Sequence, residues 1–139
     1  MNFIQWNNLY ITDIELVDEH HQKLFSLVNS LYRGVFECQD LTEERCLTKS
    51  ILAELKDYID YHFTAEEQLM SKYNYPEYIQ HLEEHNLFRR EIASLSEQLD
   101  AGKFALSFPM FEFLRNWLTN HILISDKKYS PWVIECGVK

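Results

Sequence analysis

Residues that interrupt helices are scarce in this chain, and their scarcity constrains the fold more than any other feature. Among 139 residues there are only three glycines and three prolines. A protein built from β-strands needs frequent turns, and Gly and Pro are the residues that most often supply them. The sequence therefore predicts an all-α fold made of a few long helices.

Four stretches carry apolar residues at alternating steps of three and four, which is the period of a helix with one buried face. The first begins at His21, a turn at residues 73–76 follows the second, Gly102 follows the third, and the fourth begins near Pro109. Their inward positions are Leu24, Val28, Leu31 and Val35; Leu52, Leu55, Ile59, His62, Glu66, Leu69 and Tyr73; Tyr78, His81, His85, Phe88, Ile92, Leu95 and Leu99; and Leu114, Trp117, His121 and Ile124. Short connections between such helices predict an antiparallel up-down-up-down four-helix bundle.

The length is that of one domain, so we expect a single domain over residues 1–139. Residues 1–17 have no helical stripe and are predicted to lie as an N-terminal arm across a bundle of residues 18–139. Asp18 is the candidate N-cap of the first helix, and Asp40 or Thr42 that of the second, because Asp and Thr side chains accept hydrogen bonds from free helix-terminal N–H groups.

Charge and cysteine content argue against several classes of protein. The net charge of −9 disfavours binding to nucleic acid or to an anionic membrane, since both require a dense cationic face. The three cysteines are scattered and include no CxxC pair, which is not a disulfide framework. No secretion signal or membrane-spanning run of ~18 apolar residues is evident. We expect a soluble, cytoplasmic protein with no nucleic acid and no membrane as partner.

Histidines and carboxylates occupy inward positions at helical spacing. The spaced pairs are His62 and Glu66, His81 and His85, and His121 and Asp126. Each buried polar group left unsatisfied costs roughly 1–3 kcal/mol, so a bundle would not gather them without a partner. Imidazole together with carboxylate suits divalent transition metals. The pattern predicts a metal site.

A further imidazole comes from His20 or His21. His21 shares a stripe with Leu24 and Val28, whereas His20 is rotated from it by about 100°. Helical phase therefore selects His21 and leaves His20 as a surface residue or a neighbour of the ligands. In an antiparallel bundle the starts of helices one and three meet the ends of helices two and four, which predicts a common level for His21, His62, Glu66, His81, His85, His121 and Asp126.

Five imidazoles and two carboxylates are too many ligands for one ion, because zinc usually takes four and an octahedral ion six. We therefore predict two metal ions. Asp126 is the weakest ligand by geometry, since five residues turn a regular helix by about 140°, so that Asp126 must reach round or lie where the helix loosens. The Glu-x-x-His pairs of ferritin-like proteins and the HExxH motif of zinc proteases are both absent.

These motifs resemble the hemerythrin family, specifically its single-domain bacteriohemerythrin type, over nearly the whole chain. The matching segments are WNNLY (6–10), DEHHQKL (18–24), HFTAEE (62–67), YP (75–76), HLEEH (81–85), WLTNH (117–121) and DKKY (126–129). The resemblance also selects His21 and supplies Asp126 as a ligand. Two departures are visible: Asp13 stands where the family often has glycine, and His20 replaces the usual glutamine.

The resemblance implies a non-haem di-iron centre that binds dioxygen reversibly, for oxygen storage, transport or supply rather than catalysis. By this resemblance, one iron is held by His81, His85 and His121, the other by His21 and His62, and the bridges are Glu66, Asp126 and an oxo or hydroxo group. One coordination position then stays open, on the two-histidine iron. Trp117 and Leu118 lie one turn before His121 and are expected to wall the pocket against water.

Two alternatives stay open. The same centre with greater access of water is expected to act as an enzyme that reduces peroxide or nitric oxide. Alternatively, iron or oxygen occupancy changes the surface presented to a protein partner, which would make the chain a sensing module. The carrier and the enzyme differ in pocket access and reductant supply rather than in their metal ligands.

Overall fold

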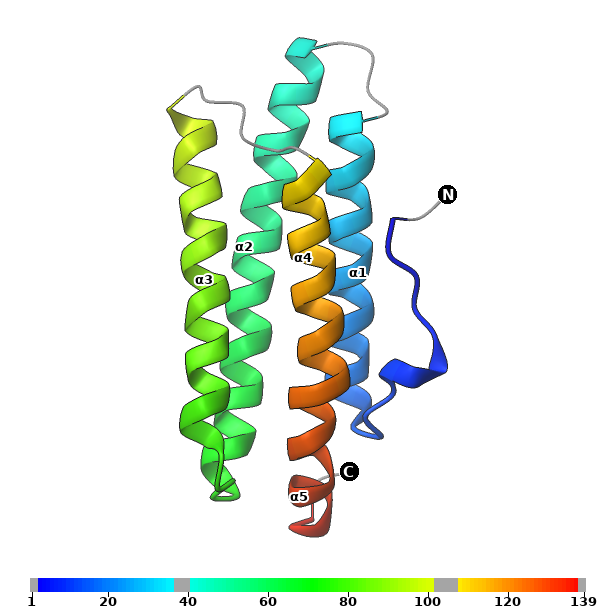
Figure 1. Ribbon diagram of the computed structural model, residues 1–139, viewed down its shortest axis with the longest axis vertical. Helices are drawn as coiled ribbons and strands as arrows, with labels where there is room; N and C mark the ends of the chain where they lie inside the picture. The colour runs from blue at the N-terminus through cyan, green and yellow to red at the C-terminus, as the bar shows by residue number, and fades with distance from the viewer. Residues whose placement is uncertain (1–2, 37–40, 102–107, 138–139) are drawn as a thin grey trace.

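The computed structural model describes residues 3–36, 41–101 and 108–137, and within them all regular structure is helical. The long helices are α1 (Glu15–Phe36), α2 (Leu41–Lys72), α3 (Tyr78–Asp100) and α4 (Phe108–Asn120). They run alternately up and down (Figure 1), which confirms the predicted antiparallel four-helix bundle. No helix in these ranges is both long and apolar enough to cross a membrane.

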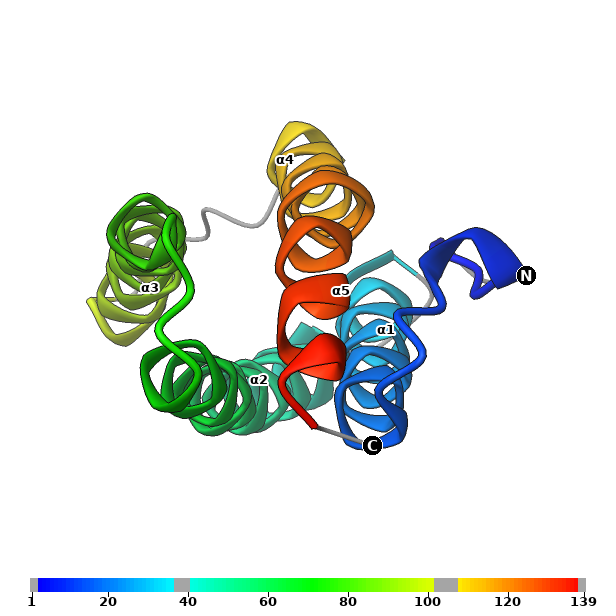
Figure 2. The same cartoon turned by 90° about the horizontal axis from the view of Figure 1, so that it is seen from below.

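Helix α4 continues without a break into a π-helix, η2 (His121–Asp126), and then into α5 (Lys127–Glu135). Seen from below (Figure 2), α5 extends from beneath α4 towards α1 and α2. A short 3-10 helix, η1 (Asn8–Tyr10), lies in the N-terminal arm. The predicted N-cap at Asp40 and the residue Gly102 after α3 lie outside the described residues, as do the side chains of Thr42 and Leu99.

Two clusters of buried apolar side chains fill the bundle, and the polar side chains of interest lie between them. The larger cluster includes Leu24, Leu31, Leu55, Ile59, Phe63, Phe88, Ile92, Leu114 and Leu118. The smaller cluster consists of Ile14, Val17, Met70, Tyr75, Tyr129 and Val133. Where the structure describes their side chains, the other stripe positions are buried or partly buried, as their spacing predicts, but Ile124, predicted to face inward, is 67% exposed, while Ile122 is buried.

The N-terminal arm lies along α1 (Figure 1) and is held by polar contacts at both ends. The side chain of Asn29 accepts a hydrogen bond from the backbone N–H of Ile4 at 2.9 Å and donates one to its carbonyl at 2.8 Å. Asp18 accepts hydrogen bonds from the backbone N–H and the hydroxyl of Thr12, at 2.9 and 2.7 Å. Because α1 begins at Glu15, the prediction of Asp18 as N-cap is wrong; Asp18 lies inside the helix and fastens the arm.

Asp13, just before α1, has a φ of 67°, in the left-handed region that glycine adopts without strain. A non-glycine residue in this conformation destabilises the folded state by roughly 1–2 kcal/mol. Glycine avoids that strain, but it lowers the free energy of unfolding by roughly 0.4–1 kcal/mol because it increases the entropy of the unfolded chain. We therefore expect Asp13→Gly to raise the free energy of unfolding in urea by about 0.5 kcal/mol. Asp13→Val is the matched control and should lower it; a Gly variant less stable than the parent would contradict this account.

Candidate metal centre

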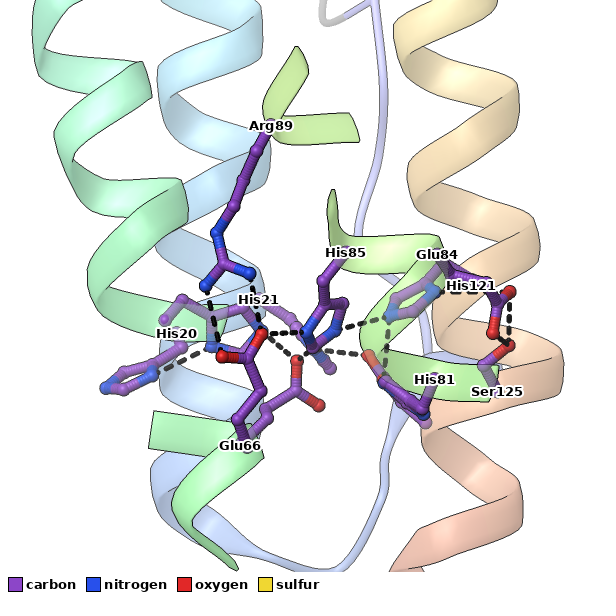
Figure 3. Close-up of polar contacts among 12 residues, drawn as sticks. His20, His21, Glu66, His81, Glu84, His85, Arg89, His121 and Ser125 are labelled. Carbon is purple, nitrogen blue, oxygen red and sulfur yellow. Dashed lines mark hydrogen bonds and ion pairs between the residues drawn. The ribbon is translucent and has the colours of Figure 1, made fainter. Parts of the chain in front are cut away.

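Seven polar side chains meet in the layer between the two apolar clusters. They come from four elements: His21 from α1, His62 and Glu66 from α2, His81 and His85 from α3, and His121 and Asp126 from η2. None of the seven is more than 4% exposed. Figure 3 shows labelled members of the set pointing towards one another from different helices. The structure thus brings together every residue that the sequence proposed as a ligand.

The seven side chains form two overlapping groups, within each of which one ligand atom per residue lies within 4.8 Å of all the others. One group contains Glu66, His81, His85, His121 and Asp126, and the other contains His21, His62, Glu66 and Asp126. Both carboxylates are therefore common to the two groups. The histidines divide unequally, three on one side and two on the other.

The two shared carboxylates are close to imidazole nitrogens without being hydrogen-bonded to them. The Nε2 atoms of His21 and His81 lie 2.9 Å from Oδ2 and 3.1 Å from Oδ1 of Asp126. The Nε2 of His62 lies 2.9 Å from Oε1 of Glu66. Yet all four carboxylate oxygens of Glu66 and Asp126 are buried without a hydrogen-bond partner. Donor atoms that approach one another in this way, without aligned hydrogen bonds, fit the ligands of a shared cation.

Electrostatics within the cluster also favour a cation. Burial would lower the pKa of His121, but Asp126, Glu84 and Glu66 raise it to about 10. Burial would raise the pKa of Asp126, but His121, His21 and His81 hold it well below its usual value. The chain alone therefore keeps a protonated His121 beside an ionised Asp126. A metal ion would supply that positive charge instead and release the proton.

The π-helix explains how Asp126 reaches the site from five residues beyond His121. Its backbone hydrogen bonds run from residue i to i+5, so each turn contains more residues than an α-helical turn. His121 and Asp126 consequently share a face, with His121 Nε2 at 3.2 Å from Asp126 Oδ1. This is the loosened helix that the sequence left as one of two options for Asp126. The same change of register turns Ile124 outward and Ile122 inward.

The outer nitrogens of three candidate ligands face a second set of polar side chains (Figure 3). Nδ1 of His85 lies 2.8 Å from Oε2 of Glu67, and Nδ1 of His62 lies 2.9 Å from Nδ1 of His20. Nδ1 of His121 lies 3.6 Å from Oε1 of Glu84, too far for a direct hydrogen bond. Partners of this kind fix the tautomer and orientation of metal-binding histidines.

The sequence missed most of these outer residues. Arg89 donates hydrogen bonds to Glu67, at 2.7 Å from Nη1, and to Asp60, at 3.0 Å from Nε. Ser125 donates to Glu84 at 2.8 Å. The positions of Glu67 beside Glu66 and Arg89 four residues after His85 were the only available signals, and neither is specific. His20, predicted to be a surface residue or a neighbour of the ligands, is a buried neighbour.

Aromatic rings hold two of the candidate ligands on the side of the larger apolar cluster. Trp117, which is partly buried, stacks on His121 with centroids 4.5 Å apart and planes inclined by 13°. Phe63 stacks on His85 at 3.8 Å and 1°. Leu118 is 2% exposed and lies three residues before His121, on the same side of α4. Trp117 thus contacts a candidate ligand directly, and Leu118 lies in the larger apolar cluster one turn before His121.

The sequence of this chain is similar to those of known metal-binding proteins. The model of the hemerythrin HHE cation binding domain matches residues 12–133. A hemerythrin-like protein of Naegleria gruberi is 32% identical over 124 residues, covering 89% of this chain and 88% of that protein. A bacteriohemerythrin of Methylococcus capsulatus is also 32% identical, over 86% of this chain and 88% of that protein.

Solved structures give the same result. The crystal structure of a wild-type hemerythrin superposes with a TM-score of 0.85 at 29% identity, covering 94% of this chain and 98% of the other. Since the family model spans most of the chain, and relatives match along nearly their whole length, the similarity extends well beyond the metal-binding motifs. This chain belongs to the hemerythrin family.

Proposed function

We propose that this protein binds dioxygen reversibly at a non-haem di-iron centre, for oxygen storage, transport or supply in the cytoplasm. The observation that carries the proposal is the unequal division of histidines between two ligand groups that share both carboxylates. Two octahedral ions held in this way, with an oxo or hydroxo bridge, would have one unfilled position, beside His21 and His62. Membership in a family known for oxygen binding supports it.

Each side chain has a defined part in this proposal. His81, His85 and His121 would hold one iron, His21 and His62 would hold the other, and Glu66 and Asp126 are common to both groups of ligands. Carboxylate bridges favour iron or manganese over the softer metals. When bound, two ferrous ions would supply the electrons that reversible binding of dioxygen requires. The protein's own contribution is to fix the ligands in a buried layer and to keep bulk water away from them.

Anaerobic loading with ferrous iron, followed by cycles of exposure to oxygen and its removal, tests the proposal. We expect two irons per chain and a visible spectrum that appears with oxygen and disappears without it through repeated cycles. Immediate irreversible oxidation would contradict a carrier. Sustained turnover with peroxide or nitric oxide would instead favour the enzyme.

Leu118 is expected to protect the oxygenated protein from autoxidation. Truncation to alanine opens space one turn from His121, which admits water to a site that otherwise excludes it. We expect Leu118→Ala to shorten the lifetime of the oxygenated form by about tenfold, followed as decay of its visible absorption. Leu114→Ala is the matched control, because Leu114 is equally buried on α4 but one turn further from His121. Equal lifetimes in the parent and Leu118→Ala would refute the protective role.

A further inference from the structure

His20 is buried beside the ligand cluster without being one of the seven. It is 5% exposed, and its Nδ1 lies 2.9 Å from Nδ1 of His62. Figure 3 shows His20 at the edge of the cluster. The other nitrogen of His62, Nε2, faces the cluster at 2.9 Å from Glu66. His62 therefore uses its two ring nitrogens in different directions, one towards the candidate metal and one towards His20.

The position of the shared proton follows from this geometry. Two imidazole nitrogens 2.9 Å apart have room for one proton between them. When Nε2 of His62 binds a metal, its Nδ1 must carry the proton and act as the donor. Nδ1 of His20 is then the acceptor, and the remaining proton of His20 resides on Nε2. If His20 were doubly protonated, its Nδ1 would also carry a hydrogen, and the two hydrogens would point at each other between the rings. The contact therefore requires neutral His20.

Two tyrosines hold the ring of His20 in this orientation. The centroid of the Tyr58 ring lies 5.8 Å away, nearly perpendicular at 75°, and that of Tyr61 lies 5.2 Å away at 50°. His20 comes from α1 and both tyrosines come from α2; Tyr58 is partly buried and Tyr61 is 60% exposed. The Nδ1 of His20 is directed at His62, so its direct contact with the cluster is made through that ligand.

The corresponding partner in the other ligand group has a different charge. Nδ1 of His85 lies 2.8 Å from the carboxylate of Glu67, which is itself held by Arg89. A carboxylate acceptor makes an imidazole ligand more electron-donating than a neutral acceptor does. The three-histidine group therefore has an anionic outer partner, and the two-histidine group has a neutral one.

We propose that His20 is a positioning residue for His62: its neutral Nδ1 fixes the tautomer and ring orientation of His62 and thereby strengthens metal binding at the two-histidine position. The inference rests on the ligand set in the proposed function. It concerns metal binding and not oxygen binding, so the two can fail separately.

Titration of the metal-free protein with Co²⁺, followed by its visible absorption, tests this role. We expect two equivalents in the parent and, in His20→Phe, a loss of affinity of about 10- to 100-fold for one of them. Phenylalanine keeps a ring against Tyr58 and Tyr61 but cannot accept the proton. His20→Gln should restore affinity, because its amide oxygen is an acceptor, and a purely structural role would not be rescued in this way.

A second pair of variants shows which of the two Co²⁺ positions is weakened by His20→Phe. In a His62→Ala background, His20→Phe should cause no further loss of Co²⁺ affinity, whereas Glu67→Ala should still weaken the other equivalent. Unchanged affinity in His20→Phe, failure of His20→Gln to restore it, or equal effects with and without His62 would each overturn the proposal. If Co²⁺ behaves as expected but the iron-loaded protein does not bind oxygen reversibly, the proposed function fails and the role of His20 stands.

Discussion

Replacing Glu66 with alanine is expected to leave the protein with almost no bound iron. Glu66 is fully buried and belongs to both ligand groups, so the substitution removes a ligand from each metal position at once. It also removes negative charge that offsets two divalent cations in a layer shielded from water. We expect the affinity for iron to fall by more than about 100-fold at both positions. A loss of about 100-fold is the upper limit for residues that only hydrogen-bond to a ligand, and Glu66 is a candidate ligand itself. The measurement is iron per chain after anaerobic loading and gel filtration.

Two further variants make the result specific. Glu54 lies on the same helix but is exposed, so Glu54→Ala should retain both irons. His85 belongs only to the three-histidine group, so His85→Ala should empty that position first. Retention of two irons by Glu66→Ala, at the occupancy of the parent, would show that the cluster is not a carboxylate-bridged metal site.

Removal of the metal should lower the melting temperature substantially. Among the described residues, the buried side-chain atoms that lack a hydrogen-bond partner are all in or beside this cluster, and they include both nitrogens of His21 and the hydroxyl of Tyr129. A cation satisfies ligands that otherwise destabilise the folded state. With free metal at 1,000 times its dissociation constant, the stabilisation is about 4 kcal/mol, corresponding to a shift on the order of 10 °C.

Calorimetry of the metal-free and metal-loaded protein measures this shift. It should shrink as pH falls, because protons compete with the metal for imidazole and carboxylate. In Glu66→Ala the shift should disappear, because this variant lacks a ligand common to both metal positions. A shift that persists in Glu66→Ala would show that the stabilising metal binds elsewhere on the protein. Identical melting temperatures for the loaded and metal-free parent protein would contradict a buried metal site.

Local spacing was sufficient to predict the helices and the level at which the candidate ligands meet. The spacing of Leu55, Ile59 and His62 indicates one buried helix face. The antiparallel arrangement of the helices then determines which helix ends are neighbours. Contacts between side chains on different helices did not follow from spacing. Arg89 on α3 reaches Asp60 and Glu67 on α2, and this depends on how the two helices pack.

Rotation about a helix axis was the other limit. His20 is about 100° away from the stripe of α1, which left two predictions open, a surface residue or a neighbour of the ligands; its contacts with Tyr58 and Tyr61 of α2 accompany the second. Ile124 was placed inward by continuing an α-helical period beyond His121, where the backbone no longer follows it. Choosing between the two predictions for His20 needs knowledge of a neighbouring helix, and the wrong prediction for Ile124 needs knowledge of a local change in hydrogen bonding.

The π-helical turn is equivalent to one additional residue within a continuous helix. In an α-helix one residue corresponds to about 100° of rotation, so the insertion re-aims everything that follows it. Asp126 is thereby turned into the ligand layer, and Tyr129 and Val133 into the smaller apolar cluster with Met70. An α-helical backbone through the same residues would instead turn Asp126 out of the ligand layer and misalign α5, which closes the end of the bundle. Ligand geometry and closure of the fold therefore depend on the same π-helical turn.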